Sequence, residues 1–323
     1  MSSIVIIGGG LSGLAAAVQL EQLGIDYTLV EVKPRLGGTI LTEKRDDFIF
    51  DGGSFIVEQY APWDFLETYN LTPDDVVTVG PYRDGRLVMF KQGTQTLIDA
   101  MEAQLQGAIL KRMAVSSIGF MNGRDERDGF GICLENGVML NAKGVIVAIP
   151  ARYAEHLLHS LDPLASQYLL DYQYDPTARV MLGYRQQDVP HLRPLIEPQW
   201  QPQAGDRPVK FTQVYADADR VPEGSLVLRV GIRVVDGYDE QALIAQAQRI
   251  AGGQEPVTRW AFFWPEADPI TRYVPEHAEH MTALMERLPR AVALIGTCYQ
   301  AKRLDEQIHQ GQAAAVRIAQ ALF

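Results

Sequence analysis

The chain has 323 residues, 47% of them hydrophobic, which is enough to bury a large core as two intermingled domains. Its net charge of −11, without any cluster of Lys or Arg, argues against a nucleic-acid-binding protein. Cys133 and Cys298 lie far apart without ligand spacing, so neither a disulfide nor a metal site is expected. No apolar run reaches the roughly 18 residues of a membrane helix, and no signal or transit peptide fits before the first strand. A cytoplasmic location is therefore expected.

The first 31 residues have the order of a dinucleotide-binding βαβ unit. An apolar strand over residues 4–7 leads into the turn Gly8-Gly9-Gly10-Leu11-Ser12-Gly13. An alanine-rich helix over residues 14–23 and a second strand over residues 27–30 follow, and Glu31 closes that strand.

The glycines of this turn, the helix that follows it and Glu31 each have a physical role in binding a dinucleotide. Gly8 permits the tight turn, Gly10 lets the backbone approach a pyrophosphate, and Gly13 lets the helix pack closely on the strand. The helix N-terminus, with Leu11 and Ser12, offers unpaired N–H groups and a partial positive charge to the phosphates. Glu31 is placed to accept hydrogen bonds from a ribose.

A second glycine pair follows the acid, and NAD binding does not require it. The segment Lys33-Pro34-Arg35-Leu36-Gly37-Gly38-Thr39, followed by residues 48–55, resembles the flavin oxidoreductases of the amine oxidase and protoporphyrinogen oxidase superfamily. In that superfamily an Arg-x-Gly-Gly segment runs alongside FAD, and the next strand and its glycines approach the flavin ring. The resemblance implies that FAD contacts Val32, Arg35, Gly37, Gly38, Thr39, Gly53, Ser54 and Phe55.

The middle of the chain fits the same family. Residues 91–97 are predicted to open a helix that ends near Gln106, and residues 114–118 resemble the strand whose Val115 backbone contacts the adenine. Residues 129–134 and 137–140 predict a hairpin. Residues 144–150 predict a buried strand, and the resemblance places Ala148 at the cofactor.

The C-terminal region also resembles this superfamily. A strand over residues 292–295 leads through Gly296-Thr297-Cys298-Tyr299 to a helix for which Asp305 is the expected N-cap. In the family a glycine here approaches the pyrophosphate, and the helix N-terminus points at flavin O2, where it stabilises negative charge. The resemblance implies cofactor contacts by Gly296, Thr297, Gln307 and Ile308.

The expected fold is α/β, with a Rossmann-like FAD-binding domain of the glutathione-reductase-like kind and an inserted substrate domain on a mixed β-sheet. The FAD-binding domain is predicted over residues 1–58, 89–150 and 274–323, and the substrate domain over residues 59–88 and 151–273. Within the latter, strands are expected over 174–184 and 225–235, a helix over 239–250 and a mobile loop over 198–207.

Three side chains are candidates for the chemistry. Arg179 aligns loosely with a lysine that many amine oxidases hold near flavin N5, and an arginine there could clamp a carboxylate but could not act as a base. Trp264 and Tyr299 could line the face of the ring, although both are equally well explained as core aromatics. His277, beside Glu276 and Glu279, is expected at a solvated helix N-terminus.

The sequence also departs from the family. The first substrate-domain segment is only about thirty residues long, where amine and protoporphyrinogen oxidases carry a longer insertion, so a smaller or more open pocket is expected. Ala301-Lys302-Arg303 replaces a glycine turn, and the two cations are expected to face solvent. Leu304 occupies roughly one wall of the amine oxidase aromatic cage. The cysteine that bonds flavin covalently in monoamine oxidases has no counterpart, so FAD is expected to be non-covalent.

These features predict an FAD-dependent oxidoreductase that transfers a hydride from a small organic substrate, an amine or a cyclic C–N or C–C bond, to flavin N5. Oxygen is the simplest electron acceptor. Three alternatives stay open: a protoporphyrinogen oxidase with a trimmed substrate domain, a renalase-like dihydronicotinamide oxidase, and a flavin-binding scaffold without turnover. The oligomeric state is also open.

Overall fold

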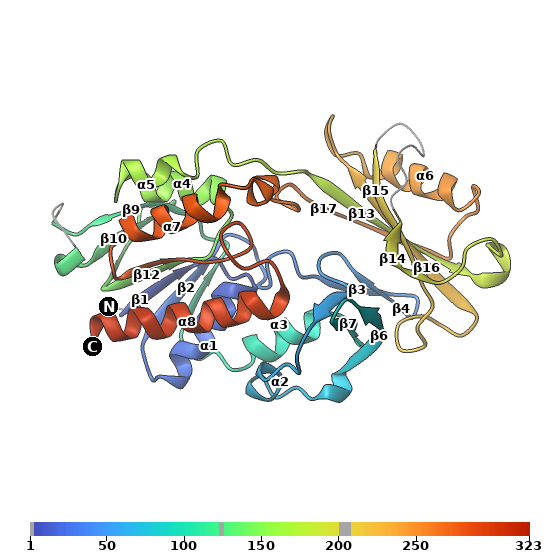
Figure 1. The fold of residues 1–323 in the computed structure, drawn as a ribbon, viewed down its shortest axis with the longest axis horizontal. Coiled ribbons are helices and arrows are strands. Elements are labelled where there is room, and N and C mark those ends of the chain that lie inside the picture. Colours follow the sequence, from blue (N-terminus) through green and yellow to red (C-terminus); the bar gives the residue numbers. More distant parts are fainter. Residues whose placement is uncertain (1–2, 123–125, 200–207) are drawn as a thin grey trace.

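The computed structural model describes residues 3–122, 126–199 and 208–323, and it has two lobes (Figure 1). One lobe is built on a parallel sheet covered by helices on both faces. The other is built on an antiparallel sheet with one helix against it. The chain passes between the lobes several times, so both are discontinuous in sequence.

The first lobe is a five-stranded parallel sheet in the order β18-β12-β1-β2-β8. Its strands are β1 (Ile4–Ile7), β2 (Tyr27–Glu31), β8 (Ala108–Lys111), β12 (Gly144–Val147) and β18 (Val292–Leu294). One face packs on α1 (Leu11–Gln22), α3 (Gln95–Glu102) and α8 (Leu304–Leu322). The other packs on α4 (Ala151–His159), α5 (Pro163–Gln167) and α7 (His277–Arg287), and on the antiparallel sheet of β9 (Val115–Phe120), β10 (Phe130–Leu134) and β11 (Met139–Ala142).

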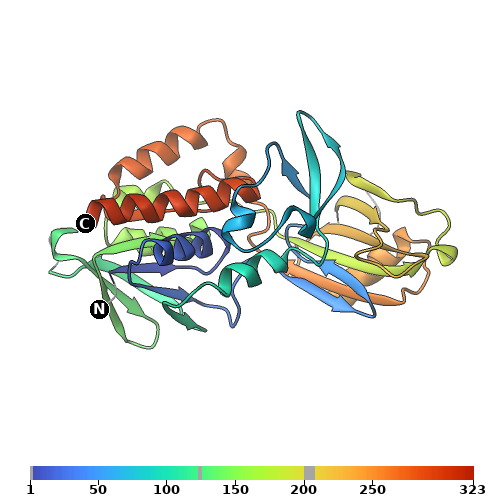
Figure 2. The same cartoon turned by 90° about the horizontal axis from the view of Figure 1, so that it is seen from below.

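The period of two along β1 explains the two cores. Ile4 and Ile6 belong to the core beneath α1 and α8, and Val5 and Ile7 to the core beneath α4 and α7. α1 and α8 lie side by side (Figures 1 and 2) because their contact residues are small. A Cβ on Gly311 would lie 2.3 Å from the carbonyl oxygen of Ser12, so only glycine allows this approach.

The second lobe is a five-stranded sheet in the order β14-β15-β16-β13-β17. Its elements are β13 (Thr177–Arg185), β14 (Leu195–Gln199), β15 (Val209–Tyr215), β16 (Ser225–Arg233), β17 (Thr258–Trp264) and α6 (Glu240–Ile250). Asp239 caps α6 by accepting a hydrogen bond from the Ala242 N–H at 3.1 Å. All pairings between these strands are antiparallel, whereas a mixed sheet was expected.

The two faces of this sheet differ in character. Even-numbered residues of β13 and β16, such as Val180 and Leu228, pack beneath α6. Odd-numbered residues, such as Met181 and Val227, face the first lobe and pack on Phe48. This face therefore roofs the region between the lobes.

Short elements fill the space between the lobes. They are β3 (Thr42–Arg45) paired with β4 (Phe48–Asp51), the sheet of β5 (Val57–Gln59), β7 (Gly85–Phe90) and β6 (Val76–Tyr82), and the helix α2 (Phe65–Thr68). Elsewhere, 3₁₀ turns precede β6 (Pro73–Asp75), join β9 to β10 (Glu126–Asp128), follow β13 (Gln186–Asp188) and precede α7 (Ile270–Tyr273). Asp51, at the end of β4, is only 1% exposed. It accepts hydrogen bonds from Thr42, Thr94 and Arg220, and so ties both lobes to one carboxylate.

Most predicted elements are confirmed, with shifted ends. The helix predicted to reach Gln106 ends at Glu102, and the strand predicted over 144–150 ends at Val147. Of the loop predicted over 198–207, residues 200–207 lie outside the described part of the chain, and Pro198 and Gln199 belong to β14. Residues 151–172 share a core with the parallel sheet, although the predicted boundary placed them in the substrate domain.

Glu21 fastens α1 to the start of β8. One carboxylate oxygen accepts hydrogen bonds from the N–H groups of Gln106 (2.6 Å) and Gly107 (2.8 Å) and from the Tyr27 hydroxyl (2.7 Å). Burial alone would raise the pKa of Glu21, but these hydrogen bonds outweigh it and lower the pKa. A lowered pKa gives stability above the ordinary value of 4.5, which is lost as the pH falls through the folded-state pKa.

Replacing Glu21 by glutamine is therefore expected to lower the free energy of unfolding by about 1–2 kcal/mol at pH 7, with the difference shrinking in acid. Urea unfolding at several pH values measures this. The exposed Glu223→Gln is the matched control and should change little at any pH. A difference between Glu21→Gln and the wild type that does not vary with pH would contradict the assignment.

Candidate functional site

A pocket between the two lobes begins at the glycine turn after β1. Gly8 has φ +103°, which favours glycine, and a Cβ on Gly13 would lie 2.0 Å from the carbonyl oxygen of Gly8. α1 starts with Gly10 as N-cap, so no side chain caps its first turn, and that turn contains no acidic residue. Gly10, Leu11 and Ser12 line the pocket, and the Ser12 hydroxyl is buried without a partner. The pocket thus meets the positive end of a helix and an unused hydroxyl group.

Glu31 is fixed next to this turn. It is 7% exposed and accepts hydrogen bonds from the N–H groups of Gly9 (2.7 Å) and Lys33 (2.8 Å). It lies behind the turn rather than in the lining of the pocket.

The second glycine pair faces the first turn across the pocket. Gly37 (φ +99°) and Gly38 (φ +58°) both line it, and a Cβ on Gly38 would lie 3.1 Å from the Cα of Gly10. Arg35 stabilises this loop by donating to the carbonyl oxygens of Leu36, Gly38 and Ile40. Because Gly10 and Gly38 have no side chains, the two loops leave a space between them that larger residues would fill.

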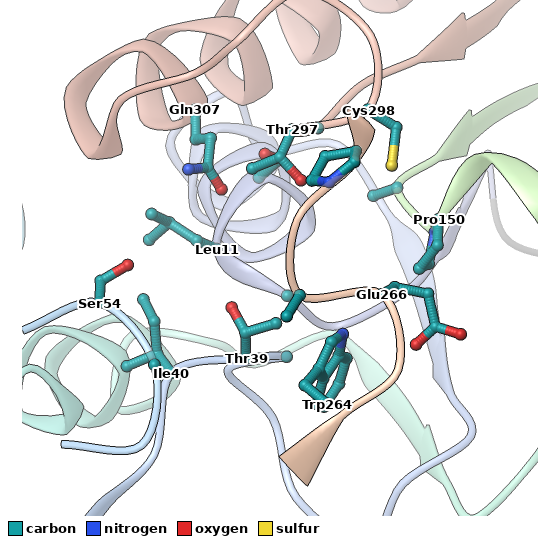
Figure 3. Close-up of a pocket in the computed structure, with 18 of the residues that line it drawn as sticks. Leu11, Thr39, Ile40, Ser54, Pro150, Trp264, Glu266, Thr297, Cys298 and Gln307 are labelled. Carbon is teal, nitrogen blue, oxygen red and sulfur yellow. The ribbon is translucent and has the colours of Figure 1, made fainter. Parts of the chain in front are cut away.

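The opposite wall comes from the C-terminal segment. Gly296 (φ +126°), Thr297, Cys298 and Gln307 line the pocket, and Figure 3 shows Thr297, Cys298 and Gln307 along one side of it. Asp305 is not the N-cap of α8, as predicted from the sequence; Arg303 is. The reason is that Glu306 accepts from the N–H groups of Lys302 (2.7 Å) and Arg303 (2.9 Å), which starts the helix earlier and pairs Asp305 with Arg303.

The far end of the pocket is charged. Arg179, Trp264, Glu266, Arg272 and Lys302 line it, and Figure 3 shows Glu266 and Trp264 at the side away from Gln307. Glu266 accepts a hydrogen bond from the Tyr153 hydroxyl at 2.9 Å and lies 3.4 Å from an Arg152 nitrogen. Three cations therefore accompany one carboxylate that already has partners, which favours an anion in this pocket.

Arg179 and Trp264 are held differently. An Nη of Arg179 donates to the carbonyl oxygen of Gly52 at 3.0 Å, its Nε is buried without a partner, and burial lowers its pKa. The Nζ of Lys33 lies 3.4 Å from the centre of the Trp264 ring. The sequence reasoning missed Lys33, because its separation of more than 200 residues from Trp264 hides the contact.

Some predicted site residues lie outside the lining of the pocket. They are Gly8, Gly13, Glu31, Val32, Arg35, Phe55, Val115, Tyr299 and Ile308. Tyr299 is buried behind the wall, where its hydroxyl donates to the carbonyl oxygen of Ile149 at 2.7 Å. Residues of the lining that the sequence reasoning did not name as site residues include Ile40, Ile149, Pro150, Glu266, Ala267, Pro269, Arg272, Ile295 and Cys298.

Two expectations about charged groups can be compared with the structure. Lys302 is exposed to solvent, as expected, and also borders the pocket, whereas Arg303 pairs with Asp305 and Glu306. His277 is not solvated: it is 6% exposed, and its Nε2 lies 3.0 Å from the carbonyl oxygen of Cys298. Burial lowers the pKa of His277.

Two models of known protein families match the sequence of this chain. A model of the family described as flavin containing amine oxidoreductase matches residues 79–250, more than half of the chain. The chain belongs to this family. A second model, described as an NAD(P)-binding Rossmann-like domain, matches residues 6–68.

Individual relatives agree with this assignment. A coproporphyrinogen III oxidase of Bacillus subtilis is 41% identical over 83 residues, which cover 24% of this chain and 16% of that protein. The fold is similar to that of a protein from an Exiguobacterium species provisionally assigned as a protoporphyrinogen oxidase (TM-score 0.78, 16% identity, 98% of both chains). It is also similar to reduced UDP-galactopyranose mutase (TM-score 0.71, 14% identity, 99% of this chain and 96% of that one). In the Bacillus subtilis relative and two other curated relatives, the matched segment covers between 6% and 16% of the relative's length.

The family is one of flavin-containing oxidoreductases, which agrees with the FAD cofactor that the glycine motifs predicted. The residues of the pocket fit the cofactor. The uncapped first turn of α1 and the orphaned Ser12 hydroxyl suit a pyrophosphate, and the facing glycines Gly10 and Gly38 leave room for it. None of the helices in the described part of the chain is long and apolar enough to cross a bilayer.

Proposed function

We propose that this flavin oxidoreductase oxidises a small organic substrate at the end of the pocket formed by Arg179 and Trp264. The observation that supports this most is the continuity of one pocket, lined at one end by Gly10 and Ser12 and at the other by these two side chains. FAD, when bound, supplies the hydride acceptor and passes two electrons on, in the simplest case to oxygen.

The protein's own residues would bind and orient the substrate. The Trp264 ring supplies a flat apolar wall, and Arg179 supplies a fixed cation whose Nε has no protein partner. Arginine cannot take up a proton, so Arg179 would position an electronegative group and would not act as a base. Hydride transfer from a C–H bond next to nitrogen requires mainly this positioning and the exclusion of water.

A porphyrinogen is the second candidate substrate, because the coproporphyrinogen III oxidase of Bacillus subtilis is 41% identical over its matched segment. The dihydronicotinamide alternative has no comparable support in the structure. The cytoplasmic location and the non-covalent attachment of FAD stay predictions. Acid precipitation tests the second, since non-covalent flavin moves to the supernatant.

Stopped-flow reduction of the purified holoprotein with amines, porphyrinogens and dihydronicotinamides tests the proposal. Rapid bleaching of the flavin absorbance by one class, with peroxide formed on reoxidation, would support it. A protein that no member of these classes reduces would contradict it.

Arg179→Met is expected to lower kcat/KM for the substrate found in this screen by roughly tenfold to a hundredfold, because one charge-assisted hydrogen bond is lost. Flavin content should stay at the wild-type level. Arg185→Gln, which removes an exposed cation from the same strand, is the control and should change neither quantity. An unchanged kcat/KM in Arg179→Met would remove Arg179 from the site.

A further inference from the structure

The segment Gly53–Ser54 has a pocket on each side. On one side it lines the pocket described above. On the other, it lines a second pocket together with Phe55, Ile56, Phe211, Gln213 and Arg229. The second pocket lies under the odd-numbered face of the antiparallel sheet.

Arg229 is held in the second pocket by several contacts. It is 6% exposed, and its guanidinium lies between the rings of Phe55 (5.4 Å) and Phe211 (5.1 Å). One Nη donates to the side-chain oxygen of Gln213 (2.6 Å) and the other to the carbonyl oxygen of Gly53 (3.1 Å). Its Nε is buried and has no partner.

Two further arginines lie near Arg229, and Asp51 attracts it only from beyond salt-bridge distance. In β13, Met181 lies opposite Arg229, so Arg179 is its diagonal neighbour on the same face of the sheet. Arg220, which also stacks on Phe55, is paired with Asp51. In the described ranges of the chain no carboxylate pairs with Arg179 or Arg229. Burial and the neighbouring Arg179 lower the pKa of Arg229 to about 9.

A buried cation without a directly paired counter-ion is expensive, and an anionic ligand that bound there would offset that cost. Two neutral acceptors and two aromatic rings hold Arg229 in a fixed orientation, so the guanidinium is preorganised for an anion. The apolar rings beside it suit the carbon skeleton to which that anion is attached.

We propose that the second pocket binds the carboxylate of an organic acid substrate through Arg229. This inference rests on the proposed function and adds the chemical class of the substrate. Arg179, the diagonal neighbour of Arg229 on the same face of the sheet, would face the reacting end of the same molecule. The reaction would then favour acids that carry the oxidisable bond a short distance from the carboxylate.

Calorimetric titration of the holoprotein with phenylacetate and with its neutral isostere phenylacetamide tests this proposal. The wild type is expected to bind the acid at least roughly tenfold more tightly than the amide. Arg229→Gln should weaken binding of the acid by roughly tenfold to a hundredfold and leave the amide unchanged, and Arg229→Lys should restore part of the loss. Arg185→Gln is the control and should behave as the wild type.

Equal binding of acid and amide by the wild type would overturn the proposal, and so would wild-type binding by Arg229→Gln. Tighter binding of inorganic phosphate than of phenylacetate would also overturn it, because the pocket would then be an anion site of another kind. If Arg229→Gln does not fold, the acid-to-amide ratio of the wild type and the Arg229→Lys variant decide.

The binding assay needs no turnover, so it separates this proposal from the proposed function. Preference for the acid in a protein whose flavin no substrate reduces would count against the proposed function alone. Reduction by substrates without a carboxylate, together with equal binding of acid and amide, would count against the carboxylate site alone.

Discussion

Replacing Asp51 by asparagine is expected to lower the free energy of unfolding by about 3–5 kcal/mol. Asp51 and Arg220 are 1% and 0% exposed, and the Oδ2 of Asp51 lies 2.5 Å from an Nη of Arg220. Asparagine keeps the shape of the side chain but leaves the guanidinium buried without a counter-ion. Because Gly52, Gly53 and Ser54 follow directly, the variant should also retain less FAD. Urea unfolding with saturating FAD and the flavin absorbance of the purified protein measure both effects.

Two further variants make this prediction specific. Glu43→Gln breaks the exposed Glu43–Arg45 pair and should change the free energy of unfolding by less than about 1 kcal/mol. The double variant Asp51→Leu/Arg220→Met removes both buried charges and should recover most of the loss. A loss of less than about 1 kcal/mol in Asp51→Asn would show that the pair does not hold the lobes together.

Gly13→Ala is expected to weaken FAD binding by at least roughly a hundredfold. The added Cβ would lie 2.0 Å from the Gly8 carbonyl oxygen and 3.3 Å from the Ala148 Cβ, so α1 must move away from β1. That movement displaces the first turn of α1, which presents Ser12 to the pocket. Titration of the apoprotein with FAD, followed by flavin fluorescence, gives the affinity.

The control for this variant is Gly80→Ala, whose new Cβ meets nothing within 4 Å. It should bind FAD as the wild type does. Circular dichroism separates loss of the site from loss of the fold. FAD binding by a folded Gly13→Ala within threefold of the wild type would contradict the packing described for this turn.

The parts of the fold that depend on local physics could be predicted from the sequence. The turn at Gly8 and the contact at Gly13 allow no other residue without a shift, so their spacing indicated the βαβ unit. The strands β1 and β12 are buried on both faces and read as continuous apolar runs.

What could not be predicted depends on contacts between distant segments. His277 reads as a solvated residue beside two glutamates, but Tyr172 and Cys298 cover it. Arg229 reads as an ordinary strand arginine, because nothing near it in sequence shows that Phe55 and Phe211 enclose it. The start of α8 depended on Glu306, whose reach back to Lys302 competes with capping by Asp305.

The contact between α1 and α8 has a consequence for synthesis on the ribosome. α1 ends at Gln22, but β18 begins only at Val292 and α8 at Leu304. At 5–20 residues per second, the partner of α1 emerges roughly 15–60 s after α1 itself. During that interval the face of α1 that α8 later covers stays exposed, and the edge of β12 is exposed from its own synthesis until that of β18, so we expect the nascent chain to need protection from aggregation. FAD, whose pocket is lined by Gly296 and Gln307, is expected to bind only after Gln307 has been translated.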